Sequence, residues 1–69
     1  MKNESNPDVL ISDQGSLFLV TPMSEAARDW VSENVQLEGW QWMGISFAVE
    51  WRFAQDLISG MQGDGLEVA

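Results

Sequence analysis

The chain has 69 residues and a net charge of -8, because eleven acidic side chains stand against three basic ones, and it contains no histidine, cysteine or tyrosine. It therefore lacks the side chains that most often transfer protons, attack substrates covalently or bind transition metals near neutral pH. This composition favours a binding protein over an enzyme and predicts no catalytic residue, no metal ligand and no cofactor.

The length allows a single domain, which we place at residues 8–69 after a polar, flexible tail over residues 1–7. Hydrophobic residues make up 45% of the chain and four are tryptophans, so a dense core is predicted and disorder is not. No apolar run approaches the ~20 residues of a membrane span, and the first residues lack the apolar core of a signal peptide. We therefore expect a cytoplasmic protein that anionic membranes and nucleic acid repel.

The first ordered segment is predicted to be a β-hairpin. Apolar residues 9–11 and 17–20 flank turn-forming residues 12–15, in which Gly15 is free to adopt a positive φ. The second run is apolar on both faces and predicts a central strand, but its pattern does not indicate which face meets the helices.

A helix from Glu25 to about Asn34 follows, with Ser24 as its N-cap. Its core-facing arc is predicted to comprise Ala26, Ala27, Trp30 and Val31. Residues 36–39 are predicted to form an irregular segment. Two further extended runs follow, 40–43 and 45–50, with Gly44 as a turn or bulge.

The last helix begins near Trp51 and ends at Gly63 or Gly65, and residues 66–68 can add a short edge strand. One side of this helix is apolar and consists of Phe53, Ala54, Leu57, Ile58 and Met61. The order β-β-α-β-β-α predicts a small α+β domain with a mostly antiparallel sheet and two helices packed on one face.

Three acids recur every four residues along the first helix: Glu25, Asp29 and Glu33. Such a row has about 6 Å of axial rise per step, and its like charges weaken the helix. A solvated outer face and a binding surface explain it equally well. As a mimic of B-form DNA, with one charge per about 3.4 Å of each strand, the row alone is sparse. Acids from other segments would have to contribute: Asp13, Glu38, Asp56 and Asp64.

The tryptophans allow two interpretations. Trp30 lies on the apolar arc of its helix and is predicted to be core, and Trp51 is predicted to be core or rim. Trp40 and Trp42 share one strand face, where core packing is the first expectation and an exposed aromatic pair that anchors a partner is the alternative. Four tryptophans are many for so small a core, and a homodimer would also use them.

Several scattered positions, from the turn glycine to the helix stop, resemble a group of short, acidic, uncharacterised bacterial and prophage proteins. They are Gly15-Ser16-Leu17-Phe18-Leu19, Pro22, Ala27, Trp30, Trp42, Gly44, Val49-Glu50, Arg52-Phe53, Asp56 and Asp64-Gly65. The resemblance covers residues 15–68 and transfers no catalytic residue. In kind, the chain is also similar to phage anti-CRISPR proteins, which are short, frequently acidic and poor in cysteine. That likeness implies an inhibitor that binds a Cas protein or surveillance complex and blocks its contact with target DNA.

The sequence thus predicts a non-enzymatic acidic inhibitor in the bacterial host cytoplasm, monomeric or homodimeric, whose partner is a basic protein surface. The predicted contact residues are Glu25, Asp29 and Glu33, with Asp56 and Asp64 as supporting acids and Trp40 and Trp42 as aromatic candidates. Two alternatives stay open: an antitoxin or regulatory subunit that neutralises a basic partner, and a structural homodimer.

Overall fold

The computed structural model of the chain describes residues 6–36 and 42–69. Its elements, in chain order, are β1 (Val9–Asp13), β2 (Leu17–Pro22), α1 (Glu25–Asn34), β3 (Trp42–Met43), β4 (Ser46–Glu50) and α2 (Trp51–Gly63). The strands pair antiparallel in the order β1-β2-β4-β3. The prediction of a small α+β domain with an antiparallel sheet and two helices is confirmed.

The strand content departs from the prediction after α1. Three strands, β1, β2 and β4, have five or six residues. With these three strands alone the element order is β-β-α-β-α, because β3 is only a two-residue pairing at the edge of β4. Ile45, predicted to begin the following strand, instead lies with Gly44 in the turn that joins β3 to β4. Gly44 has a φ of 70°, which suits a tight hairpin turn. Trp40, placed in the first of these runs, lies outside the described residues.

The predicted β1–β2 hairpin is confirmed, and β2 is central because it pairs with both β1 and β4. Gly15 lies in the turn with a φ of 91°, a conformation that side chains other than hydrogen disfavour. Its amide donates to Oδ1 of Asp13 at 2.8 Å, and the Gln14 amide donates to the Leu17 carbonyl at 2.8 Å. The turn thus uses one of the acids for its own hydrogen bonding.

One face of the sheet is buried under both helices. Alternate strand residues on this face enter a single apolar cluster with both helices, formed by Val9, Val20, Val49 and Phe47 from the strands, Ala27, Val31 and Val35 from α1 and its end, and Ala54, Leu57 and Met61 from α2. The opposite face carries Leu10 and Leu17, which are 41% and 46% exposed. The face of β2 that meets the helices, which its pattern leaves open, is therefore that of Phe18 and Val20.

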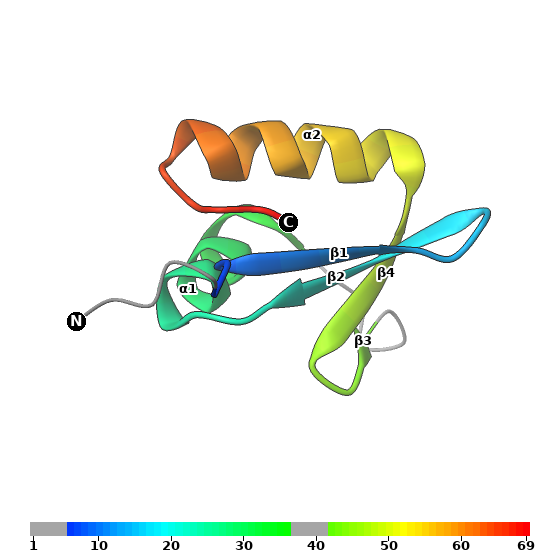
Figure 1. Cartoon of the computed structure of the whole chain (residues 1–69), viewed down its shortest axis with the longest axis horizontal. Helices are drawn as coiled ribbons and strands as arrows, with labels where there is room; N and C mark the ends of the chain where they lie inside the picture. Colours follow the sequence, from blue (N-terminus) through cyan, green and yellow to red (C-terminus); the bar gives the residue numbers. More distant parts are fainter. Residues whose placement is uncertain (1–5, 37–41) are drawn as a thin grey trace.

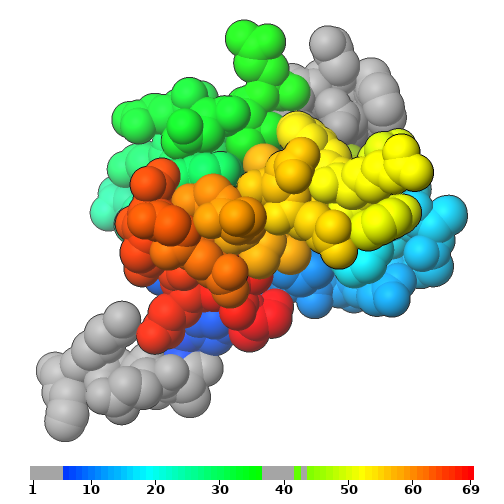
Figure 2. Space-filling model, turned by 90° about the horizontal axis from the view of Figure 1, so that it is seen from above, coloured from blue at the N-terminus to red at the C-terminus, as the bar shows by residue number. Residues whose placement is uncertain are grey.

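Helix α1 has the predicted bounds and the predicted cap. The Ser24 hydroxyl accepts a hydrogen bond from the Ala27 amide at 3.0 Å, as an N-cap does. Trp30 packs against the core and lies over α2, where a Cβ added at Gly60 would come within 3.1 Å of the indole. The two helices lie side by side in Figure 2, with α1 in green and α2 running from yellow to orange. Ala26, predicted to face the core, is exposed.

Helix α2 begins at Trp51 as predicted, immediately after β4. Its buried stripe comprises Ala54, Leu57 and Met61, whereas Phe53, which belongs to the predicted apolar side, lies at the margin of this stripe and is 40% exposed. Neither helix of the described chain has both the length and the apolar character needed to cross a membrane.

The end of α2 is a Schellman motif. The Leu66 amide donates to the Met61 carbonyl at 2.9 Å and the Gly65 amide to the Gln62 carbonyl at 3.1 Å, with Gly65 at a φ of 93°. Of the two glycines predicted to stop the helix, Gly65 makes the reversal. The chain then returns beneath α2 to the start of β1, where Val68 forms a parallel bridge with Val9 (Figure 1).

Candidate functional site

The acidic row, Glu25, Asp29 and Glu33, lies on the outer side of α1, and all three residues are exposed. At about 100° per residue, the row is centred opposite Ala27 and Val31, the buried residues of this helix. Within the part of the chain that the structure describes, none of the three carboxylates makes a hydrogen bond or an ion pair. The row is therefore presented entirely to solvent or to a partner.

Other acids serve the fold. The Asp64 carboxylate accepts a hydrogen bond from Nε1 of Trp30 at 2.6 Å, which joins the end of α2 to α1. The Asp8 carboxylate accepts from the Glu67 amide at 2.8 Å and holds the C-terminal segment beside β1. Asp13 likewise serves the hairpin turn, a role that its place among the turn-forming residues predicts. The N–H of a packed indole needs a hydrogen-bond acceptor. The prediction that Trp30 is packed was therefore the one sequence signal that an acceptor such as Asp64 would lie near it.

Two further acids belong to the predicted site, Asp56 and Glu38. Asp56 is exposed on α2. Glu38 lies outside the described residues. The acids do not converge into a chelating cluster, since no group of three acidic side chains among the described residues could hold a metal ion. The acidic row is therefore the part of the predicted site that stays together on one element.

The described tryptophans have three different roles. Trp30 is half-buried between the helices. Trp51 is 49% exposed, and the guanidinium carbon of Arg52 lies 5.9 Å from the centre of its ring, within the range of a cation–π contact. Trp42 is 39% exposed and packs edge-on against Phe47, with ring centres 5.2 Å apart. Trp40, its predicted companion on the strand face, falls in the segment that is not described.

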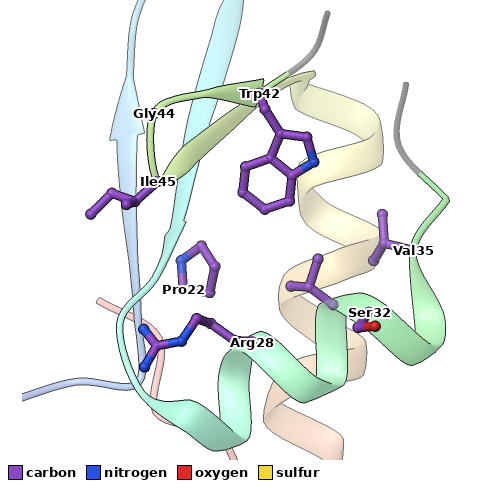
Figure 3. A pocket seen from close by; sticks show the side chains of 8 residues that line it. Pro22, Arg28, Ser32, Val35, Trp42, Gly44 and Ile45 are labelled. Carbon is purple, nitrogen blue, oxygen red and sulfur yellow. The ribbon is translucent and has the colours of Figure 1, made fainter. Parts of the chain in front are cut away.

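A cleft of about 500 Å³ lies between α1 and the β3–β4 hairpin, and no sequence pattern indicates it. We call it the hairpin cleft. The described residues that line it are Pro22, Arg28, Val31, Ser32, Val35, Trp42, Gly44 and Ile45. The ring of Trp42 extends toward the cleft from the hairpin side, opposite α1 (Figure 3). Volumes of this order are typical of ligand sites, in which apolar walls dominate and a few polar groups set the orientation.

No polar or charged side chain of the described residues is buried. Among the described residues, the acidic row and the hairpin cleft are two features that could engage a ligand. Both involve α1, which presents the row outward and one flank to the cleft.

Comparisons with known protein families, curated proteins and solved structures found no match to this chain.

Proposed function

We propose that the protein is a non-enzymatic acidic inhibitor that binds a basic surface of a partner protein through the acidic row of α1. The observation that carries the proposal is the position of Glu25, Asp29 and Glu33, exposed on the side of α1 that faces away from the core. A cationic partner surface is the complement of this arrangement, since matched charge speeds encounter and fixes orientation.

The row weakens the helix that carries it. Like charges four residues apart destabilise a helix by about 0.2–0.5 kcal/mol per pair, and the row contains two such pairs. Glu25 gains some compensation from the positive end of the helix dipole in the first turn, but Asp29 and Glu33 lie beyond it. A basic partner would remove the repulsion on binding and would add attraction across the interface.

The most specific form of the proposal is a phage-type anti-CRISPR protein. The partner would then be a Cas effector in the bacterial cytoplasm, whose basic channel holds DNA through its phosphates. The net charge of -8 in 69 residues supports this form. One acid per about 6 Å is less dense than DNA phosphate, so the inhibitor would occupy part of the channel and would not reproduce a whole duplex.

The test compares two variants that lose the same charge. The row variant carries Asp29→Asn and Glu33→Gln, and the control variant carries Glu50→Gln and Glu67→Gln at exposed positions away from α1. Each is mixed with purified Cas effectors of several types, and binding of labelled target DNA is measured by gel shift. We expect the row variant to lose inhibition and the control to retain it. Full inhibition by a folded row variant would remove the row from the site.

A second experiment addresses the class of partner. The tagged protein is used to capture partners from bacterial lysate at low and at high salt, with the row variant in parallel. Capture that weakens with salt and with loss of the row is the expected result, because exposed charges are screened. A small basic protein retained in this way in place of a Cas subunit would indicate the antitoxin or regulatory-subunit alternative.

A further inference from the structure

The hairpin cleft adjoins the acidic row, and the two share α1. We infer that the cleft receives a large apolar side chain from the same basic partner segment that the row binds, so the partner carries an aliphatic or aromatic residue flanked by lysine or arginine. This inference rests on the proposed function and names the chemistry of its partner.

The cleft is apolar where a ligand would enter it. Val31 on α1 and Val35 at its C-cap form the buried base of the cleft, and Trp42 and Ile45, which are 39% and 69% exposed, form its hairpin side. Ile45 occupies a two-residue turn, where polar residues are the usual choice. Contact with an apolar side chain would remove this exposed surface from water and thereby favour binding.

Among the described residues that line the cleft, Arg28 is the only charged one, and its charge is directed away from the interior. Nη1 donates to the Met23 carbonyl at 3.0 Å, outside the cleft walls. In Figure 3 the guanidinium lies near β2, on the side away from Trp42. The arginine therefore lines the cleft with its methylene stem, as long basic side chains commonly do, and the space beside Trp42 suits an uncharged group.

The row and the cleft adjoin along one helix. Ser32, on the cleft wall, is three residues after Asp29 and directly before Glu33. Positions three apart lie about 60° apart around a helix and within one turn, so a segment resting on the cleft brings its neighbouring side chains over the row. A partner segment with an apolar residue in the cleft and flanking cations over the acidic row would thus contact both features at once.

The charge of each possible occupant of the cleft determines whether the acidic row attracts or repels it. A second copy of the chain would bring another net charge of -8 to the cleft, and an anionic amphiphile would likewise meet the acidic row at close range. A basic segment meets no such repulsion and gains attraction from the row. The occupant that fits is therefore a cationic, partly apolar stretch of a partner protein.

The test uses two short, amidated, lysine-rich peptides that differ only at a central residue, which is leucine in one and serine in the other. Their dissociation constants are measured at low salt by titration into ¹⁵N-labelled protein. We expect the leucine peptide to bind about tenfold more tightly, as burial of one large aliphatic side chain allows. The leucine-dependent shifts should centre on Ser32, Trp42 and Ile45.

Two variants locate the effect. Ser32→Phe fills the cleft from an exposed helix position, and Ser59→Phe adds the same group to the exposed face of α2 as a control. We expect only Ser32→Phe to remove the advantage of leucine, while Asp29→Asn with Glu33→Gln weakens both peptides alike. Equal affinities of the two peptides, or an advantage that survives Ser32→Phe, would overturn the cleft assignment. Salt-sensitive binding of both would in that case leave the proposed function standing, whereas no binding of either peptide would overturn both.

Discussion

Two glycines at the end of α2 differ in backbone conformation alone, and alanine at each should have opposite effects on stability. A Cβ added at Gly63 or at Gly65 meets nothing within 4 Å, so neither substitution causes a clash. Gly63 is the last residue of the helix, whereas Gly65 has a φ of 93°. Comparing the two alanine variants thus separates the effect of backbone strain on stability from any effect of packing.

The expected magnitudes follow from these conformations. An L-residue in a left-handed conformation costs about 1–2 kcal/mol, partly offset by the reduced entropy of the unfolded chain. We expect Gly65→Ala to lower the free energy of unfolding by about 1 kcal/mol, or the melting temperature by about 4–8 °C for a domain of this size. Gly63→Ala should raise the free energy of unfolding by about 0.5 kcal/mol, since alanine is the better helix former.

The assay is urea unfolding followed by tryptophan fluorescence, supported by thermal melting followed by circular dichroism. A chemically synthesised chain with D-alanine at position 65 is the matched control, because a D-residue prefers positive φ and should be at least as stable as glycine. In the L-alanine variant, the amides of Val9 and Ile11, which donate to the Glu67 and Ala69 carbonyls, should exchange faster with solvent. Equal stability of the Gly63→Ala and Gly65→Ala proteins would refute the reasoning.

Three further predictions concern α1 and its contacts. Ser24→Ala should lower the free energy of unfolding by about 1 kcal/mol through loss of the N-cap, and Ser24→Asp should restore it, as urea unfolding would show. Asp29→Lys should stabilise the isolated protein by about 0.5–1 kcal/mol at low salt by turning two repulsions into attractions; the gain should fade in high salt, and partner binding should fall. Gly60→Leu should displace the indole of Trp30 and lower the free energy of unfolding by about 1–3 kcal/mol, with the indole N–H resonance reporting the displacement.

The candidate site could be predicted only in part. The spacing of Glu25, Asp29 and Glu33 places them on one side of any helix that contains them, so their common exposure followed once the apolar residues faced the core. The use of Asp64 by Trp30 could not be foreseen, since the two residues are separated by 34 positions and meet only when α2 packs beside α1. The hairpin cleft likewise requires the distance between α1 and the β3–β4 turn, which no local pattern encodes.

The sequence by itself determined the features that depend on neighbouring residues: the cap at Ser24, the bounds of α1, the start of α2, the first hairpin and the turn at Gly44. Each follows from local hydrogen bonding, from a permitted φ or from a repeat of apolar residues. Only the tertiary structure decided which face of β2 is buried, because that strand is apolar on both faces and long-range packing selects one. It also decided that Phe53 stays at the surface and that β1 is the strand beside which the C-terminal residues, predicted to form an edge, lie. Contacts between distant segments have no local signature, since they form only where the packing of the whole chain brings them together.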